Sequence, residues 1–259
     1  MAHKVLIVTT STGRAGEDGP ETGFDWISIA APYWRLREAG VRVGFASIRG
    51  GKPPGDPATA VDAETGGRAG SVNMFLGDGT AVDALAQSTA VDRIDPSQWD
   101  AVLIADGFGG LWDLAPSDAL AALIAALWER GGLVAAIGAG AAALPGVRDK
   151  DGRTLVLGKR LTCLPDAAAT AAGIVPPVLP EALLRHKGAQ VWVSGDGEDT
   201  GVIEEGRLIT AQNARAAADL ALQLLDALDA NIARAGADAA TPGGAGLTDA
   251  AAAVPRDGD

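Results

Sequence analysis

Short apolar runs alternate along the chain with segments whose apolar residues recur at helical spacing. Such alternation is typical of βαβ units, in which helices cover both faces of a parallel sheet. The runs that we expect to be strands are 4–9, 41–47, 101–105, 133–137, 191–193 and 207–210. The segments that we expect to be helices are 26–38, 116–130 and 213–228. The pattern predicts a doubly wound α/β fold with a mostly parallel sheet.

Two stretches lie outside this pattern. Residues 50–92 are rich in Gly, Pro, Asp and Thr and too long for a plain connection, so we expect an excursion that flanks the ligand pocket. Residues 230–259 are mostly Ala, Gly and polar residues without an apolar period, so we expect a disordered C-terminal tail. The chain is thus predicted to form one domain over residues 1–229. Ligands of doubly wound sheets bind beyond the carboxyl ends of the strands, which makes the turns after the strands the candidate sites.

The charge balance removes several classes of partner. The 259 residues include 21 basic and 33 acidic side chains, a formal net charge of −12. Such a chain repels polyanions, so no nucleic-acid partner is expected. The apolar runs are far too short to span a membrane, and the first of them is too short for a signal peptide. Cys163 is the only cysteine, so no intrachain disulfide forms. We therefore expect a cytoplasmic protein with no membrane partner.

The sequence offers little support for a metal or a cofactor. His3 and His186 are the only histidines, and no Cys/His cluster has the spacing of a zinc site. Residues 138–143 fit G-x-G-x-x-A, the dinucleotide-binding pattern, but Pro145 would soon end a helix, and basic residues occupy the positions of the acidic ribose ligand. A tight strand-to-helix turn is favoured, and a nucleotide-binding oxidoreductase stays open as a third hypothesis that a cofactor titration tests. We expect no metal and no cofactor.

The same turn carries a resemblance to a known family. The stretch LVAAIGAGAAAL (133–144) resembles the nucleophile elbow of the ThiJ/PfpI superfamily, a class I glutamine-amidotransferase-like group. Three further stretches agree in order and spacing: TGF to AAPY (22–33) with the first-helix motif, DGFGGLWDL (106–114) with a Gly-Gly-His-Gly-x-x-Trp-Asp-Leu turn, and GRLITAQN (206–213) with the closing strand and helix cap. The resemblance covers residues 4–228 and is strongest to the larger, heat-shock-chaperone and glyoxalase-like members. It implies a flavodoxin-like fold and a homodimer.

The family's catalytic side chains are missing from the matching positions. In the family the elbow presents a nucleophilic cysteine, often followed by histidine, and a glutamate from the first helix lies against the thiol. The resemblance places Gly138 and Ala139 at the first two positions, and Ile27 and Ser28 where the glutamate belongs. Glycine has no side chain, so no thiolate forms there, and Cys163 lies on a different segment. A cysteine-dependent amidotransferase, peptidase, glyoxalase or deglycase is therefore not expected.

A carboxylate is gained close to this loss. Asp106 stands where the family has glycine, at the end of a predicted buried strand. Partial desolvation raises the pKa of such a group and suits it to general acid/base catalysis, although a turn cap is an equally good interpretation. Asp113 is expected to cap the helix that follows it. The expected site comprises Asp106, Asp25 and Ser28 as catalytic groups, Gly107 and Ala139 as backbone oxyanion-hole donors, and Phe108, Gly138, Trp26 and Trp112 as pocket walls.

Two main hypotheses describe the function. The first is a cofactor-independent lyase, hydratase, hydrolase or isomerase that acts on an uncharged or carbonyl-bearing small molecule, with Asp106 as the acid/base group. The Ala-, Gly-, Asp- and Arg-rich composition suggests a high-GC bacterium, in which such enzymes serve specialised metabolism. The second is a catalytically silent pseudoenzyme that binds a ligand or acts as a chaperone. A pocket filled by its own Trp and Leu side chains favours the pseudoenzyme, whereas an open cavity lined by Asp25 and Asp106 favours the enzyme.

Overall fold

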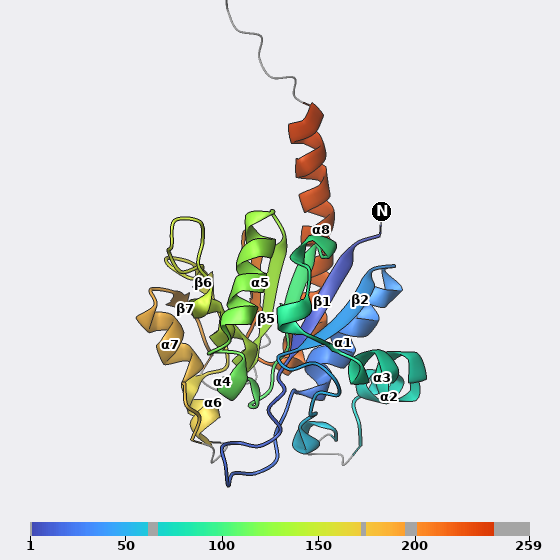
Figure 1. The fold of residues 1–259 in the computed structure, drawn as a ribbon, viewed down its shortest axis with the longest axis vertical. Helices are drawn as coiled ribbons and strands as arrows, with labels where there is room; N and C mark the ends of the chain where they lie inside the picture. The colour runs from blue at the N-terminus through green and yellow to red at the C-terminus, as the bar shows by residue number, and fades with distance from the viewer. Residues whose placement is uncertain (1, 62–66, 172–174, 195–200, 241–259) are drawn as a thin grey trace, which may run out of the picture.

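The computed structural model describes residues 2–61, 67–171, 175–194 and 201–240 (Figure 1). Its main sheet contains β1 (Lys4–Thr9), β2 (Arg42–Ser47), β3 (Thr89–Ala90), β4 (Ala101–Ile104), β5 (Leu133–Ile137), β8 (Val202–Glu205) and β9 (Leu208–Ala211). The strands lie in the order β3-β2-β1-β4-β5-β9-β8, and only β8 and β9 pair antiparallel. The predicted doubly wound, flavodoxin-like α/β fold is confirmed.

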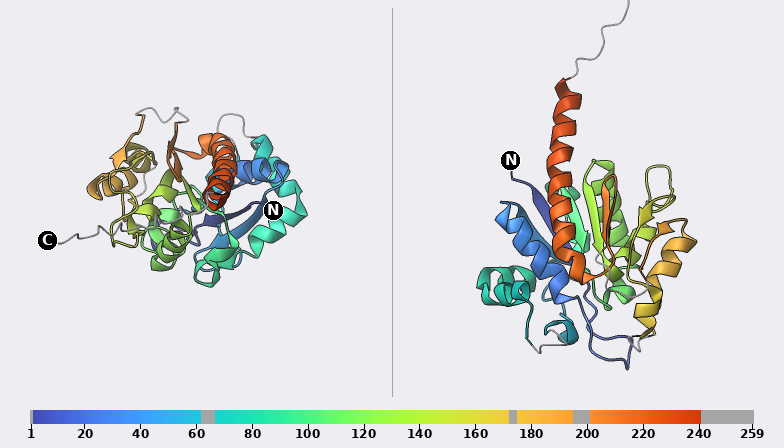
Figure 2. Two further views of the ribbon diagram at one scale, coloured as in Figure 1. Left: turned by 90° about the horizontal axis from the view of Figure 1, so that it is seen from above. Right: turned by 180° about the vertical axis from the view of Figure 1, so that it is seen from behind.

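Helices cover both faces of this sheet (Figure 2). They are α1 (Trp26–Glu38), α2 (Gly70–Gly77), α3 (Gly79–Ala86), α4 (Gly110–Asp113), α5 (Asp118–Glu129), α6 (Asp166–Ala171), α7 (Pro180–His186) and α8 (Ala217–Ala240). The strands β6 (Arg160–Leu161) and β7 (Gln190–Val191) form a separate small sheet. Helices α1 and α8 pack together on one face, and α5 lies on the other. No described helix is both long and apolar enough to cross a membrane.

The apolar runs form the central strands because both of their faces are buried. In β1, Val5 and Ile7 belong to the core cluster under α1 and α8, whereas Leu6 and Val8 belong to the cluster under α5. This division follows from the two-residue repeat of a strand, which sends neighbouring side chains to opposite faces. Strands β1 and β5 and helix α1 have the predicted bounds. A strand order that reverses between β1 and β4 then sets the crevice in which ligands of such folds bind.

The start of α5 corrects one expectation. Ser117, and not Asp113, caps this helix, because its hydroxyl accepts the Leu120 N–H at 3.1 Å. Asp113 lies at the end of α4, where its carboxylate accepts the Thr10 hydroxyl at 2.6 Å and the Ser11 N–H at 2.7 Å. The carboxylate therefore ties α4 to the loop after β1. The sequence around Asp113 could not indicate these partners, because Thr10 and Ser11 lie 103 and 102 residues earlier in the chain.

Two segments contain more helix than the sequence indicated. Residues 50–92 include α2 and α3, and apolar residues of both helices pack into the core cluster under α1. Helix α8 does not end near Leu228 but continues to Ala240, where it projects beyond the sheet (Figure 1). Alanine has the highest helix propensity, so this Ala-rich stretch forms a helix without an apolar stripe. The expectation of a disordered tail otherwise concerns residues 241–259, which lie outside the described residues.

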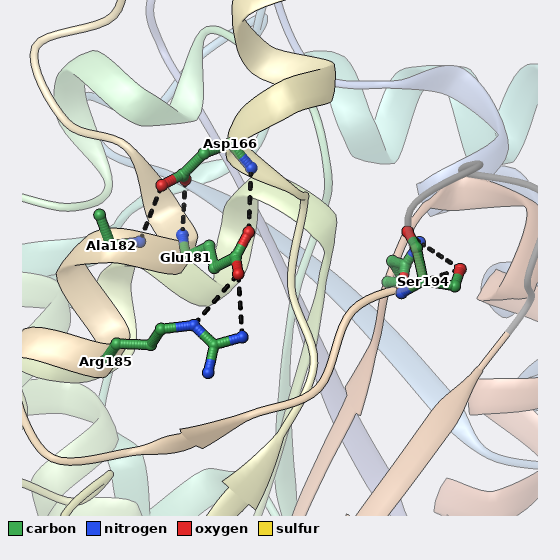
Figure 3. A network of polar contacts seen from close by, with 6 residues as sticks. Asp166, Glu181, Ala182, Arg185 and Ser194 are labelled. Atoms are coloured by element: carbon green, nitrogen blue, oxygen red, sulfur yellow. Dashed lines mark hydrogen bonds and ion pairs between the residues drawn. The ribbon is translucent and has the colours of Figure 1, made fainter.

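A polar network fastens α6 to α7 (Figure 3). The Asp166 carboxylate accepts the N–H groups of Glu181 and Ala182 at 2.9 and 3.0 Å, and thereby caps the start of α7. In return, the Glu181 carboxylate accepts the Asp166 N–H at 3.4 Å and the guanidinium of Arg185 at 2.9 Å. These bonds join two short helices that would be marginal alone.

Candidate functional site

A cavity of about 370 Å³ opens at the carboxyl ends of the central strands. The start of α1, the turn after β4 and the turn after β9 form one part of its wall, and the segment that follows β2 forms the rest. Its described lining residues are Asp25, Ile27, Ala58, Thr59, Val61, Ala69, Asp106, Asn213, Ala214 and Arg215. The cavity thus lies at the point where the strand order reverses, and it brings together Asp25 and Asp106, two of the residues predicted from the sequence.

Asp106 is held by backbone N–H groups from three parts of the chain. Its Oδ1 accepts the N–H of Gly107 at 2.8 Å and the N–H of Ala139 at 2.7 Å. A backbone N–H of Ala214 also stabilises the carboxylate. Burial nevertheless outweighs these donors and raises the pKa of Asp106 from 3.8 to about 6. At neutral pH the group is therefore mostly a carboxylate, but it can take up a proton.

Asp25 is the N-cap of α1. Its Oδ1 accepts the N–H groups of Ile27 and Ser28 at 2.7 and 3.1 Å, which satisfies two donors that the first helical turn leaves without partners. Burial, and then the negative charge of Asp106, raise the pKa of Asp25 from 3.8 to about 7. The sequence predicted a catalytic role for Asp25, and the helix cap uses only one of its two carboxyl oxygens.

Ser28 is fully buried and is not among the described residues that line the cavity. Its buried hydroxyl donates to the Asp25 carbonyl at 2.7 Å and accepts the Asp106 N–H at 3.1 Å. The Asp25 N–H in turn donates to the Asp106 carbonyl at 2.9 Å. Ser28 therefore joins the backbones that carry the two carboxyl groups, which is a positioning role.

The carboxyl group of Asp106 fills the space beside the turn that follows β5. Gly138 has φ +52°, and a Cβ at this position would overlap the carboxyl group of Asp106. The N–H groups of Gly107 and Ala139, which we predicted to form an oxyanion hole, both donate to Asp106 Oδ1. In this structure they are consequently not available to a substrate oxygen. A side chain at position 138 is therefore sterically incompatible with the carboxyl group of Asp106 as it is placed here.

The predicted aromatic walls lie elsewhere. Phe108 and Trp112 pack around a small core cluster of Leu111, Ala139 and Ala142, and Trp26 lines a different cavity. None of these three aromatic residues is among the described residues that line the cavity of Asp25 and Asp106. No aromatic residue is among the described residues that line this cavity, so it is open rather than filled by its own Trp or Phe side chains.

Several residues of the site were missed by sequence reasoning. Thr59 accepts the Trp26 N–H at 3.2 Å and lines the cavity from the segment after β2, where the composition gave no indication of a contact with α1. Asn213 caps the short turn Ala214–Ala216 that follows β9, and its Oδ1 accepts the Arg215 N–H at 3.0 Å. The sequence did not indicate that this cap brings the Ala214 N–H to Asp106. Arg215 is exposed and adds a positive charge to the cavity lining.

The glycine-rich turn is packed against protein and not open to a nucleotide. Residues 138–145 are all buried, and a Cβ at Gly140 would lie 2.6 Å from the Ala105 carbonyl oxygen. These glycines are required for close packing, which supports the tight-turn interpretation over a pyrophosphate site. Within the described part of the chain, no group of three His, Cys, Asp or Glu side chains is arranged to hold a metal ion.

Cys163 is buried in the core cluster under α5. Its pKa is raised well above the ordinary value of a thiol, mainly by burial and then by the negative charges of Glu181 and Asp166. A thiol in this setting is not ionised at neutral pH and is a poor nucleophile, because the thiolate is the reactive form.

Comparisons with known proteins agree with this architecture. The chain is 27% identical over 234 residues to the glutathione-independent glyoxalase HSP31 of Saccharomyces cerevisiae, and the match covers 87% of this chain and 98% of that protein. It is 24% identical over 237 residues to glyoxalase 3 of Candida albicans, and this match covers 88% of this chain and 99% of that protein. The structure of the 24 kDa rapid encystment protein of Francisella tularensis matches with a TM-score of 0.80 and 26% identity, over 87% of this chain and 99% of that chain. A model of the DJ-1/PfpI family matches residues 21–227, so the chain belongs to the DJ-1/PfpI family.

Proposed function

We propose that this protein is a cofactor-independent enzyme that performs acid/base chemistry on a small carbonyl compound, with Asp25 and Asp106 as its catalytic pair. The observation that carries the proposal is the open cavity of about 370 Å³ that both carboxyl groups line. A cavity of this size takes a small molecule. Two carboxyl groups in one cavity with different surroundings are a recurrent arrangement for an acid and a base.

The surroundings of the two groups suggest their roles. Asp106 has the lower pKa, about 6, and its charge is stabilised by backbone N–H groups, so it serves as the base. Asp25 has the higher pKa, about 7, partly because Asp106 is negative, so it keeps a proton when Asp106 has lost its own. The helix cap occupies Oδ1 of Asp25 and leaves Oδ2 to carry this proton.

A reaction follows from these two states. The proton on Asp25 is donated to the carbonyl oxygen of the substrate while Asp106 removes a proton from the neighbouring carbon, which gives an enol. For a substrate with a hydroxyl group on that carbon, an isomerisation is completed when Asp106 returns its proton to the former carbonyl carbon and the hydroxyl gives its proton to Asp25. In an elimination, the enol O–H returns its proton to Asp25, the carbonyl group re-forms, and the leaving group departs with the electron pair of its bond and with the proton that Asp106 holds. A substrate oxygen is thus stabilised by Asp25, since Asp106 itself occupies the N–H groups of Gly107 and Ala139. The relatives named as glyoxalases make a 2-oxoaldehyde a sensible first probe.

The test measures proton exchange and turnover together. Methylglyoxal, hydroxyacetone and dihydroxyacetone are incubated with the protein in D₂O, and NMR follows deuterium entry beside the carbonyl group and any product. We expect Asp106→Asn to lower the exchange rate by about 10²–10⁴-fold. Asp25→Asn retains a helix cap and is expected to lower it as well. The control Asp226→Asn changes an exposed carboxylate on α8 and leaves the rate unchanged. A folded Asp106→Asn variant with full activity contradicts the assigned role.

A second candidate function is a pseudoenzyme that binds a ligand without turning it over. The observation in its favour is that the donors of the elbow are satisfied internally by Asp106, so no reactive group projects from that turn. Wild-type protein that binds a carbonyl compound of the panel but gives the same exchange rate as Asp25→Asn and Asp106→Asn supports this function and refutes the enzyme.

A further inference from the structure

A second cavity, of about 360 Å³, lies between the start of α1, the loop after β2, and helices α2 and α3. Its described lining residues are Trp26, Lys52, Pro53, Pro54, Gly55, Phe75, Val82, Leu85 and Ala86. None of them lines the cavity of Asp25 and Asp106, so this is a separate site. Its volume falls within the range of small-molecule pockets.

The wall of this second cavity is apolar and fixed in place. Phe75 and Leu85 are buried in the core, and the indole of Trp26 rests on the backbone at Gly55. A Cβ at Gly55 would lie 2.5–2.6 Å from three indole atoms, so only glycine permits this contact. The ring of Phe24 supports the indole edge to face, with centroids 4.9 Å apart. A preformed aromatic wall loses little entropy when a ligand binds.

Lys52 is the one charged side chain among the described lining residues. It is exposed and makes no hydrogen bond or ion pair with another described residue. The protein as a whole carries a net charge of −12, so a positive group at an apolar cavity runs against the general charge of the molecule. An apolar pocket with a few placed polar groups is the usual form of a ligand site.

We propose that this cavity binds a small amphipathic monocarboxylate, whose apolar tail or ring lies against Trp26 and Phe75 and whose carboxylate pairs with Lys52. The apolar walls supply the affinity through burial of the tail. Lys52 selects the sign of the head group, because an ammonium head meets a positive charge there. The proposal does not depend on the chemistry of Asp25 and Asp106.

Isothermal titration with octanoate and with octylammonium tests the charge preference. The two probes share one tail and differ in the sign of the head, and the net charge of the protein alone would favour octylammonium. We expect octanoate to bind about tenfold more tightly than octylammonium, and Lys52→Glu to reverse this preference. The matched control Lys150→Gln removes another exposed lysine and leaves octanoate binding unchanged. Equal binding of the two probes, or no effect of Lys52→Glu, overturns the proposal.

Tryptophan fluorescence tests the location. Octanoate is expected to change the emission of the wild-type protein, and Trp26→Phe, which keeps an aromatic wall, is expected to remove this change while the protein stays folded by circular dichroism. Ala86→Phe fills the cavity from α3 and is expected to weaken octanoate binding by at least about tenfold. A full fluorescence response in Trp26→Phe, or unchanged affinity in a folded Ala86→Phe variant, places the ligand elsewhere and overturns the proposal.

Discussion

The carboxyl group of Asp106 occupies the space that a side chain on residue 138 would need. Gly138 and Asp106 lie on two turns that follow neighbouring parallel strands, β5 and β4. Asp106 Oδ1 is fixed there by the N–H groups of Gly107 and Ala139, so it has no easy way to move aside. The two positions therefore form one steric unit, in which only one of them can carry a side chain of this kind.

This relationship predicts energetic coupling between positions 106 and 138. Gly138→Ala places a methyl group against the carboxylate and also forces alanine to φ +52°. The backbone strain alone costs about 1–2 kcal/mol, and the overlap adds to it. In an Asp106→Gly background only the strain remains, so urea unfolding of the four proteins in this cycle should give a coupling energy of about 1–3 kcal/mol. Strictly additive changes in the free energy of unfolding would show that the carboxyl group moves away freely.

Ser28 should act on the site through position alone. Ser28→Ala leaves the buried Asp106 N–H without its acceptor, which is expected to lower the free energy of unfolding by about 1–3 kcal/mol. If Ser28 only positions the carboxyl groups, the pH dependence of the activity keeps its shape while the maximal rate falls. Ser28→Thr restores a hydroxyl and is expected to recover part of the rate. A variant in which one limb of the pH profile disappears would show that the hydroxyl itself transfers protons.

Cys163 is expected to be unreactive in the folded protein. Burial and the acidic neighbours raise the pKa of its thiol, so little thiolate is available. A disulfide reagent such as 5,5′-dithiobis(2-nitrobenzoate) should therefore label it only after denaturation. Cys163→Ala should keep full activity, with a moderate loss of stability from the change in core packing. Rapid labelling of native protein accompanied by loss of activity would return the cysteine to the mechanism.

The fold was predictable because its central strands are buried on both faces. A run such as residues 101–104 has no other stable environment, and the helices between the runs show their apolar stripes directly. The helices that the sequence did not indicate, or ended too early, have other causes. Residues 79–86 form α3 within a Gly- and Asp-rich stretch because Asp78 caps it. Helix α8 continues past Leu228 because the stretch is rich in alanine and because Asn231 donates to the Gly131 carbonyl at 2.9 Å.

The sequence indicated a residue of the candidate site only where the residue's own strand or helix places it at the carboxyl edge of the sheet. Asp25 and Asp106 follow from their places at a helix start and a strand end. The contacts of Thr59, Ala214 and Arg215 depend on how loops distant in sequence meet, which no local pattern contains. The sequence also could not show that the N–H groups of Gly107 and Ala139 donate to Asp106, because this depends on the distance between the turns after β4 and β5.

The pH dependence of the activity should report the proposed pair. Catalysis requires Asp106 without its proton and Asp25 with one, and their pKa values are about 6 and about 7. The rate of deuterium exchange is therefore expected to rise through pH 6, to peak between pH 6 and 7, and to fall above. Asp25→Asn should remove the alkaline limb. A rate that stays constant from about pH 5 to 8 would be incompatible with this pair, because at least one group changes its charge there.

The same two groups should make the protein less stable as the pH rises. In the folded state Asp25 holds its proton up to about pH 7, whereas in the unfolded chain it loses the proton near the ordinary value of 3.8. Between these limits the folded state binds more protons, so the free energy of unfolding falls with increasing pH and levels off above pH 7. Asp25→Asn keeps an N-cap but does not titrate, and its stability relative to wild type should therefore be higher at pH 8 than at pH 5 in urea unfolding.

Asp95→Asn is the matched control. Asp95 is exposed and caps the short turn Pro96–Gln98. The Ser97 N–H and hydroxyl stabilise its charge and lower its pKa, so its protonation does not change in that range and the difference from wild type should be the same at both pH values. An equal pH dependence in wild type and Asp25→Asn would show that Asp25 is already ionised at pH 5 in the folded protein, and would remove it as the acid of the proposed reaction.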